Sequence, residues 1–391
     1  MPGLIIKPRA RIFHGHEWVY SNEIKKTFGD PSPGDIVSLK DFRDRPLGSA
    51  IYNPKSQIVA RRFSRRKQDL DADFFIRRIN RAINWRKDKT NIDVSLCRIV
   101  WSESDGLPGL IIDRYGDYVV IQTLTLAMDL RIEEISTAIM DTLSPKGIIA
   151  RNDSPSRIAE GLDQETSILT GDTPDIFHLS YINTSFTIDL LSGQKTGLYL
   201  DQLDNYKKVS RFAPEKNVLD CFTNQGGFAL SCSLNGASSV TAIDISDKAI
   251  QTAQNNAHKS GAKQIEWLQA NVFDELKTYD SERRNFDLII LDPPSFTRNK
   301  KSLSDAMRGY KEIHLRSLKL LNPGGILVTF TCSHHVSDHA FLDMIKSASV
   351  DAKKNLRLIE EYTQRADHPV NPLIPETSYL KGFSFEVIPS W

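Results

Sequence analysis

The chain has 391 residues, 40% of them hydrophobic and 25% charged, which excludes a wholly disordered, collagen-like or coiled-coil protein. This length predicts about two or three domains. Every apolar run is far shorter than the roughly 20 residues of a membrane-spanning helix, so we expect no membrane span. The first residues lack a signal-peptide pattern and the four cysteines lack a disulfide pattern, which together predict a cytoplasmic protein.

The formal net charge of +1 conceals an uneven distribution of charge along the chain. Residues 1–90 contain 20 Lys and Arg against 10 Asp and Glu, and the rest of the chain has an excess of acidic residues. Such a division predicts a basic module that contacts phosphates, joined to a module with a different task.

The first 65 or so residues form short, alternating strand patterns separated by turn clusters, which predict a small β-barrel or curled sheet. A run of five cations around one aromatic residue follows. An isolated run of this kind is more often a solvated strand or linker. Because this run belongs to a basic segment and Phe63 could stack on a base, we interpret it as an RNA-binding segment made of Arg61, Arg62, Phe63, Arg65, Arg66 and Lys67.

The next part of the chain, up to about residue 180, predicts a mixed α+β unit. Apolar residues recur at helical spacing over 73–87, with arginines on the other face, and we assign Phe74, Phe75 and Trp85 to the core. Strand and turn patterns surround a second helix over 131–143. This unit shows no catalytic motif.

After about residue 180, apolar strands alternate with helical patterns, which is typical of a doubly wound parallel sheet. The predicted strands are 218–222, 240–244, 265–268, 286–292 and 326–330, and the clearest helices are 247–260 and 304–321. Strands and helices in this order predict a nucleotide-binding sheet.

A nucleoside cofactor is expected at the carboxyl ends of the first two of these strands. Asp220 ends the first strand, Gly226 and Gly227 follow in its loop, and Asp244 closes the second strand, where it could accept hydrogen bonds from a ribose. The loop lacks G-x-G-x-x-G, so S-adenosylmethionine is favoured over a dinucleotide. Asp244 could instead cap the next helix. Asn271, after the third strand, is placed to meet the adenine edge or to form a turn.

Two neighbouring strand ends carry residues suited to chemistry on a pyrimidine base. Asp292 precedes two prolines that hold the backbone rigid, and Cys332 follows the next strand. A thiolate that attacks C6 of cytosine makes C5 nucleophilic enough to take a methyl group. A nearby cation, for which Lys195 is a candidate, would favour the thiolate. The alternative is that Cys332 is a small buried apolar residue, as we expect for Cys221 and Cys232.

A local group of Cys332, His334, His335 and His339 raises the alternative of a zinc site. Neighbouring residues at a strand end point in different directions, and no second Cys or His pair completes a tetrahedral set. We therefore expect no metal.

Several motifs together resemble one known family, the bacterial large-subunit ribosomal RNA cytosine-C5 methyltransferases that carry an N-terminal PUA domain. The resemblance covers nearly the whole chain, and it is strong because the motifs occur in the family's order. The matching segments are 16–20, 52–58, 105–110, 113–117, 151–153, 194–202, 220–228, 292–296, 308–311, 331–333, 366–369 and 379–383. Two positions depart from the family, since 223–225 has an unusual sequence and Asn271 stands where Asp is common.

The resemblance implies a multidomain α/β protein with a PUA-like RNA-binding β-barrel over 1–70 and a central α+β domain over 71–180. A Rossmann-like class I methyltransferase domain with a seven-stranded sheet would follow over 181–391. It implies S-adenosylmethionine as methyl donor, Cys332 as nucleophile and Asp292 as the residue that steadies the cytosine. The expected cofactor contacts are Lys195, Thr196, Gly197, Tyr199, Asp220, Phe222, Thr223, Gly226, Gly227, Phe228, Asp244, Ile245, Ser246, Asn271, Val272, Asp292 and Pro293.

The leading hypothesis is therefore a methyltransferase that makes 5-methylcytosine in 23S ribosomal RNA through a covalent cysteine adduct. One alternative is a purine N-methyltransferase acting on ribosomal RNA, for which the Asp-Pro-Pro motif suffices. Another is a non-catalytic, RNA-binding ribosome-assembly factor, against which the intact cofactor motif argues. The sequence leaves open the target nucleotide, whether naked RNA or an assembled subunit is the substrate, and the oligomeric state, with a homodimer as one alternative.

Overall fold

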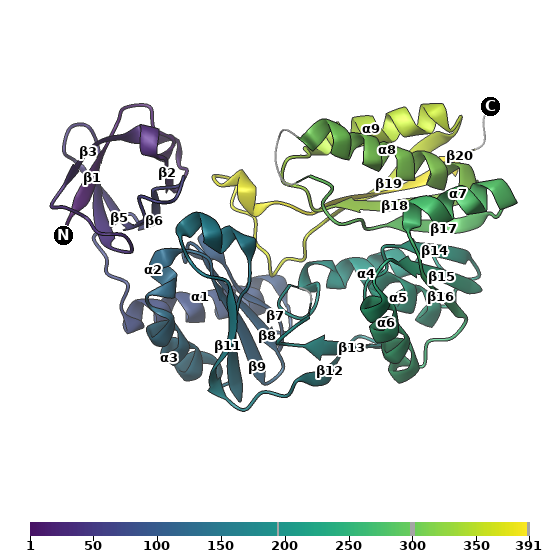
Figure 1. Cartoon of the computed structure of the whole chain (residues 1–391), viewed down its shortest axis with the longest axis horizontal. Coiled ribbons are helices and arrows are strands. Elements are labelled where there is room, and N and C mark those ends of the chain that lie inside the picture. The colour runs from purple at the N-terminus through teal and green to yellow at the C-terminus, as the bar shows by residue number, and fades with distance from the viewer. Residues whose placement is uncertain (194, 298–301, 389–391) are drawn as a thin grey trace. The chain divides into compact units, whose positions relative to one another are not determined.

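The computed structural model describes residues 1–193, 195–297 and 302–388. Gln194, which belongs to one of the family motifs, lies outside the described residues. The chain divides into two compact units (Figure 1). Unit 1 contains residues 1–177, 188–200 and 366–378, and unit 2 contains 178–187, 201–365 and the described residues from 379 onward. No helix in the described ranges is long and apolar enough to cross a membrane.

A six-stranded sheet forms the N-terminal part of unit 1, as expected from the alternating strand patterns. Its strands are β1 (Gly3–Ile6), β2 (Trp18–Val19), β3 (Ile24–Phe28), β4 (Ile36–Lys40), β5 (Pro46–Tyr52) and β6 (Ala60–Ser64). Their order is β2-β6-β5-β4-β1-β3, and only β1 and β4 pair in parallel. Alternate residues such as Leu4, Ile6, Val37 and Leu39 point into one apolar core.

The rest of unit 1 is built on a five-stranded sheet. Its strands are β7 (Leu96–Trp101), β8 (Leu110–Tyr115), β9 (Tyr118–Thr123), β10 (Gly147–Asn152) and β11 (Glu165–Gly171), in the order β11-β10-β9-β8-β7. Three helices accompany them, α1 (Ala72–Thr90), α2 (Leu126–Asp129) and α3 (Ile132–Leu143). The carboxylate of Asp71 caps α1 by accepting a hydrogen bond from the N–H of Phe74 at 2.7 Å.

The apolar face of α1 packs into the core of this part, with Phe74 and Phe75 buried as predicted. The prediction for Trp85 was wrong, because 37% of this residue is exposed. The helix has 3.6 residues per turn, and Trp85 lies one residue before the fully buried Arg86, so its side chain projects away from the core.

A buried network of charges holds segments of unit 1 that are far apart in sequence. Arg98 forms a bidentate pair with Asp113, with both N–O distances at 2.7 Å. The guanidinium of Arg86 pairs with Asp105 and donates to the backbone carbonyl of Asp367. The carboxylate of Asp367 in turn accepts from the backbone N–H of Arg98 at 3.0 Å. These pairs fix segment 366–378 against the five-stranded sheet.

Unit 2 contains the predicted doubly wound domain, with a seven-stranded sheet. Its strands are β14 (Asn217–Cys221), β15 (Ser239–Asp244), β16 (Ile265–Gln269), β17 (Phe286–Leu291), β18 (Leu321–Thr331), β19 (Asn355–Thr363) and β20 (Lys381–Ile388). The order is β16-β15-β14-β17-β18-β20-β19, and only β20 runs antiparallel to both of its neighbours. The predicted Rossmann-like sheet of seven strands is confirmed. A two-stranded sheet, β12 (Ile176–Tyr181) with β13 (Thr184–Asp189), precedes it.

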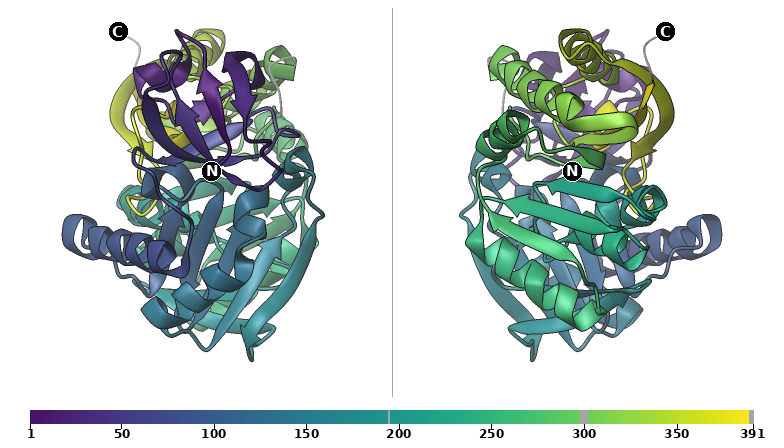
Figure 2. Two further views of the ribbon diagram at one scale, coloured as in Figure 1. Left: turned by 90° about the vertical axis from the view of Figure 1, so that its left-hand side faces the viewer. Right: turned by 90° about the vertical axis from the view of Figure 1, so that its right-hand side faces the viewer.

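Helices cover both faces of the seven-stranded sheet (Figures 1 and 2). One face carries α4 (Leu203–Ser210), α5 (Gly227–Leu234) and α6 (Asp247–Ser260), and the other carries α7 (Val272–Glu282), α8 (Leu303–Leu320) and α9 (Asp338–Asp351). A sheet covered on both faces needs strands that are apolar throughout, and β17 has this character, with Leu288 to Leu291 fully buried.

The loop between β14 and α5 has an unusual backbone. Phe222, Asn224 and Gly226 all have positive φ angles, of 64°, 49° and 85°. Gly227 is required for a different reason, because a Cβ atom at this position would lie 2.3 Å from the ring of Tyr206. The positive φ angles and the close contact between Gly227 and the Tyr206 ring therefore hold the loop in one conformation. This loop lies where a bound cofactor is expected.

We predict that Gly227→Ala destabilises unit 2, because the rigid Tyr206 ring cannot make room for the added methyl group. Overpacking of this kind costs about 1–3 kcal/mol. Urea unfolding followed by circular dichroism should show the lower midpoint. Gly309→Ala in α8 is the matched control: the nearest atom to its new Cβ would be at 3.4 Å, so this variant should be as stable as the wild type or more so. Equal stability of Gly227→Ala and wild type would contradict the argument.

Candidate active site at the carboxyl ends of the central strands

The parallel strands of unit 2 bring the predicted functional residues of that unit to one edge of the sheet. The last residues of β14 and β17 are paired, Cys221 with Leu291, and Leu291 is in turn paired with Thr329 in β18. Asp292 and Cys332 therefore leave neighbouring strands at the same edge. The order of strands reverses between β14 and β17, which is where open α/β sheets bind ligands.

Asp220 is fully buried at this edge. Its Oδ2 accepts hydrogen bonds from the hydroxyl of Thr223 at 2.5 Å and the N–H of Ala229 at 3.0 Å. Burial raises the pKa of this carboxyl to about 7, and the negative charges of Asp292 and Asp244 add to the rise, although the two hydrogen bonds oppose it. Its Oδ1 is buried without a hydrogen-bond partner among the described residues.

This arrangement fits a cationic cofactor. The negative charges of Asp292 and Asp244 act on Asp220, and its unsatisfied Oδ1 can accept a hydrogen bond from a ligand. S-adenosylmethionine carries positive charge on its sulfonium and ammonium groups, which would stabilise the ionised carboxyl.

Asp244 holds the loops on both sides of it. Its two carboxylate oxygens accept hydrogen bonds from the backbone N–H groups of Asn224 and Ser246, each at 2.9 Å. The alternative role as helix cap is wrong, because the hydroxyl of Ser246 caps α6 by accepting from the N–H of Ala249. The next residue, Ile245, is 69% exposed and offers an apolar surface at the strand end.

Three other predicted cofactor contacts have structural roles. The side chain of Asn271 caps α7 by accepting from the N–H of Phe273 at 2.9 Å. Val272 is buried in the core, and the ring of Phe228 stacks on Phe330 with centroids 5.3 Å apart. Contacts of Val272 and Phe228 with a cofactor would therefore come from their backbones rather than their buried side chains.

Asp292 is positioned by two residues that sequence reasoning did not assign to the site. The side-chain amide of Gln202 donates to Asp292 Oδ2 at 3.0 Å, and Asn205 donates to Gln202 Oε1 at 2.7 Å. Both amides are buried. Gln202 lies at the end of a segment that matches a family motif, and this was the available signal. Pro293 is also buried.

Cys332 differs from the other cysteines in its exposure. Cys97, Cys221 and Cys232 are fully buried, as predicted for the latter two, whereas Cys332 is only half-buried. The residue after it, Ser333, shares a hydrogen bond of 2.7 Å with the hydroxyl of Ser295. This bond joins the Asp292 loop to the Cys332 loop.

A buried tyrosine and a lysine complete the surroundings of Cys332. The hydroxyl of Tyr310 lies 2.9 Å from that of Thr331 and 3.3 Å from that of Ser333, and burial raises its pKa. Lys381 in β20 is paired with Thr331 in β18, and Thr331 directly precedes Cys332. The pKa of this ammonium is lowered because burial outweighs the negative charges of Asp338 and Cys332, which raise it. Lys381 thus supplies positive charge to the thiol, which sequence reasoning did not foresee.

Four predicted cofactor contacts belong to unit 1. The hydroxyl of Thr196 is buried and lies 2.6 Å from Asp113 and 2.8 Å from the hydroxyl of Tyr115. The ammonium of Lys195 lies 4.2 Å from the centre of the Tyr199 ring. Gly197 lies between Thr196 and the buried Leu198. Their roles toward the cofactor remain predictions.

The predicted RNA-binding run is only partly available to a ligand. Arg61 pairs with Glu103 at 2.7 Å and Arg62 pairs with Glu17. The prediction that Phe63 stacks on a base was wrong: it is 4% exposed and packs against Phe74, with ring centroids 5.4 Å apart. Phe63 lies on the side of β6 that faces α1, and a local sequence pattern does not reveal this. Arg65, Arg66 and Lys67 follow the strand and are exposed.

The described residues contain no group of three His, Cys, Asp or Glu side chains able to hold a metal ion. His339 instead pairs with Asp343 on α9, with an N–O distance of 2.9 Å.

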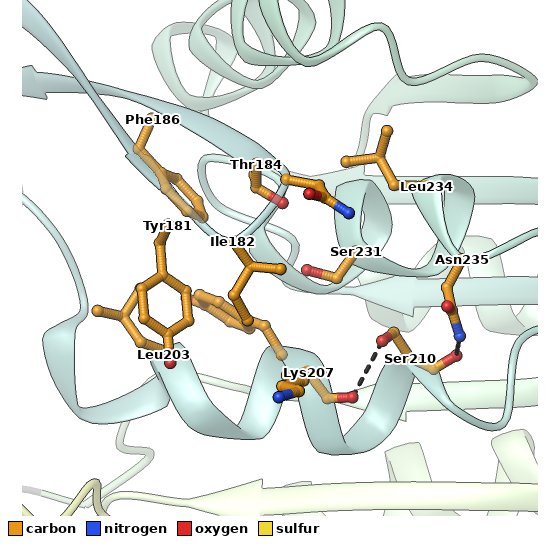
Figure 3. A pocket seen from close by; sticks show the side chains of 12 residues that line it. Tyr181, Ile182, Thr184, Phe186, Leu203, Lys207, Ser210, Ser231, Leu234 and Asn235 are labelled. Carbon is orange, nitrogen blue, oxygen red and sulfur yellow. Dashed lines mark hydrogen bonds between the residues drawn. The ribbon is translucent and has the colours of Figure 1, made fainter. Parts of the chain in front are cut away.

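A separate hollow in unit 2 lies between the turn of the β12–β13 hairpin and helices α4 and α5 (Figure 3). Tyr181, Ile182 and Leu203 line it, and Lys207 is the only charged residue among the described residues that do so. The strand ends that carry Asp220, Asp244 and Asp292 do not contribute to its lining. This hollow is therefore distinct from the candidate active site.

Comparisons with known families agree with this architecture. Residues 4–65 match the model of a PUA-like domain, which corresponds to the six-stranded sheet. Residues 160–374 match the model of an S-adenosylmethionine-dependent methyltransferase, which includes β14 to β19. S-adenosylmethionine is thus the cofactor of the fold that holds the acidic edge described above.

Solved structures share the fold of the entire chain at low sequence identity. A putative methyltransferase complexed with SAH has a TM-score of 0.86 and 22% identity, and the match covers 99% of this chain and 100% of the other. A putative SAM-dependent methyltransferase from Streptococcus mutans has a TM-score of 0.85 and 21% identity, with the same coverage.

Sequence relatives are much more similar. A ribosomal RNA large subunit methyltransferase I of Vibrio cholerae is 37% identical over 95% of this chain and 96% of its own length. The protein of the same name from Erwinia tasmaniensis is 37% identical over 98% of this chain and 99% of its own. This chain therefore belongs to the family of S-adenosylmethionine-dependent methyltransferases that includes ribosomal RNA large subunit methyltransferase I.

Proposed function

We propose that this chain methylates C5 of a cytosine in large-subunit (23S) ribosomal RNA through a covalent adduct with Cys332. The proposal rests on one observation. A half-buried thiol, Cys332, and the Asp292 carboxylate lie on two adjacent loops, and the Ser295–Ser333 hydrogen bond joins these loops. The names of the relatives support ribosomal RNA as the substrate.

The reaction follows from the positions of these groups. The thiolate of Cys332 forms a bond to C6, and the electron pair of the C5–C6 double bond makes C5 nucleophilic. S-adenosylmethionine supplies the methyl group to C5 and leaves as its neutral thioether. Loss of the C5 proton to a base then restores the double bond and expels the thiolate. Asp292, oriented by Gln202, accepts a hydrogen bond from the exocyclic amine and keeps the ring in place.

The cofactor is held by this chain's own acidic edge. Asp220 faces the ammonium group and Asp244 accepts from the ribose, while Ile245 and the backbone near Asn271 contact the adenine. The raised pKa of Asp220 supports this assignment, because a cation beside a buried carboxyl of this kind would favour its ionised form. The remaining predicted contacts belong to the same proposal. A cytoplasmic location also belongs to it, in agreement with four free cysteines.

The competing function is N-methylation of a purine at the Asp-Pro-Pro motif. It requires no thiol, so it does not account for the lysine beside Cys332. A homodimer and the three-domain division at residues 70 and 180 remain predictions.

We expect a trapped covalent complex when the protein is incubated with S-adenosylmethionine and ribosomal RNA containing 5-fluorocytidine. Fluorine cannot leave C5 as a cation, so the adduct persists and migrates slowly on a denaturing gel. Cys332→Ala should abolish the complex, whereas Cys232→Ala, which changes a buried cysteine, should retain it. A complex that survives in Cys332→Ala, or a methylated purine in the nucleoside digest, would establish the alternative reaction.

Lys381 should control the reactivity of Cys332. Iodoacetamide reacts with thiolates, and the other three cysteines are buried, so native alkylation reports on Cys332. Lys381→Gln should lower the alkylation rate at pH 7.5 several-fold, because the neighbouring positive charge is lost. Lys381→Arg should retain most of the rate. Equal rates in all three proteins would remove Lys381 from the mechanism.

The affinity for S-adenosylmethionine should rise with pH through the titration of Asp220. With a pKa of about 7, this carboxyl is mostly protonated at pH 5.5 and must ionise to pair with an ammonium group. Linkage then predicts up to about tenfold tighter binding per pH unit below the pKa. Calorimetry from pH 5.5 to 7.5 measures this change.

The raised pKa of Asp220 has the opposite effect on the stability of the folded chain, which falls as the pH rises. An unfolded Asp ionises near pH 3.9, so Asp220 opposes folding as the pH rises from about 4 to about 7.

Asp220→Asn should bind S-adenosylmethionine weakly with little pH dependence. The exposed Asp247→Asn is the control and should keep the wild-type profile. A wild-type affinity that does not change with pH would refute the assignment of Asp220.

A further inference from the structure

The positive charge of the N-terminal region extends beyond the six-stranded sheet. Residues 1–65, which include all six strands, contain 12 Lys and Arg against six Asp and Glu, and residues 66–90 contain eight against four. This second segment comprises the connection after β6 and α1. The PUA-like domain therefore accounts for only part of the basic excess that suggested an RNA partner.

The outer face of α1 gathers part of this charge around an exposed tryptophan. Arg77, Arg81, Trp85 and Lys89 follow each other at intervals of four residues, so they form one stripe along the helix. All four are exposed, and Trp85 exposes 37% of its surface. The opposite face is fixed in the core of unit 1 by residues such as Phe75 and Ile79, so the stripe is presented on a rigid element.

The charges of this stripe are poorly compensated by the protein itself. Arg81 and Lys89 make no ion pair with any residue that the structure describes, and only Arg77 pairs with an acid, Asp73. Arg78 is flanked by Arg77 and Arg81, whose charges add to the effect of burial in lowering its pKa. The exposed Arg66 lies in the connection that leads into the helix. Helix α1 carries six Lys and Arg residues against two acids, Asp73 and Asp88, and this excess of positive charge is suited to a polyanion.

Trp85 adds a feature that charge alone does not explain. Its ring is exposed among these cations, whereas the guanidinium of Arg86, 5.7 Å from the ring, is buried in its pair with Asp105. Cations beside an exposed ring are the combination that binds unstacked nucleotides, since each base can stack on the ring and each phosphate can meet a cation.

We propose that this stripe, Arg77, Arg81, Trp85 and Lys89, binds a single-stranded segment of the RNA substrate. Trp85 stacks on a base, and the cations contact the neighbouring phosphates. The inference rests on the proposed function for the identity of the polyanion as RNA. A membrane surface is a weaker fit because the stripe has a single apolar side chain, and a protein partner is an outcome of the test.

The test measures binding of the full chain to a fluorescein-labelled, mixed-sequence single-stranded RNA of 20 nucleotides by fluorescence anisotropy. Trp85→Ala should weaken binding about 5- to 150-fold, which corresponds to the loss of one stacked base, and Trp85→Phe should retain most of the affinity. The double variant Arg81→Gln/Lys89→Gln should also weaken binding and lower the slope of log K against log salt by about 1.4.

A matched control separates this face from general charge effects. Lys25 and Lys26 are exposed on β3 of the six-stranded sheet, so Lys25→Gln/Lys26→Gln removes the same charge elsewhere and should leave the affinity within about twofold. A 20-base-pair RNA duplex should bind wild type and Trp85→Ala equally, because its bases are already stacked. Far-ultraviolet circular dichroism confirms that the variants are folded.

The outcomes distinguish this inference from the proposed function. If wild type and the α1 variants bind the single strand equally, or if the Lys25/Lys26 control loses as much, the inference is wrong while the C5 chemistry stands. If the α1 variants lose binding but wild type forms no adduct with 5-fluorocytidine RNA, the RNA-binding face stands and the proposed chemistry is wrong.

Discussion

Parallel pairing of β14, β15, β17 and β18 is the constraint on which the site depends. It places the carboxyl ends of four strands at one edge, so residues separated by more than a hundred positions in sequence become neighbours. The buried stretches of these strands are mainly apolar because helices cover both faces, and the charged side chains gather where the strands end. Asp220, Asp244, Asp292 and Cys332 all lie at these ends, so the edge brings together the residues that we assign to the cofactor and the base.

The two halves of this edge differ in charge. Around β14 and β15 the carboxylates act on one another, and burial keeps the pKa of Asp220 near neutrality until a cation is present. Around β18 the polar groups are hydroxyls and a lysine, which suit a thiol that must ionise. The Ser295–Ser333 hydrogen bond holds the loop after β17 to the loop after β18. The opposite polarity of the halves gives each reactant its own environment.

Unit 1 uses charge in two ways. Arg86 and Arg98 are buried in pairs with Asp105 and Asp113, and they hold segment 366–378, so these cations serve the fold. Arg61 and Arg62 are likewise paired with glutamates. Breaking such buried pairs would leave an uncompensated charge in the core, and these residues are not available to RNA. The exposed stripe on α1 is part of the basic excess that remains after the internal pairs are formed.

Apolar periodicity and short motifs are local signals, and they predict five of the seven strands of the unit 2 sheet, its helices 247–260 and 304–321, the site edge and the family. The exposure of some other side chains depends on how the elements pack against one another. Phe63 and Trp85 have the reverse of their predicted exposure, since a single strand or helix pattern does not show which face its neighbours cover. The roles of Lys381 and Gln202 also depend on contacts between residues distant in sequence, one through strand pairing and one through a helix packed beside Asp292. The motifs indicate the two segments, but only the folded chain reveals which groups these side chains contact.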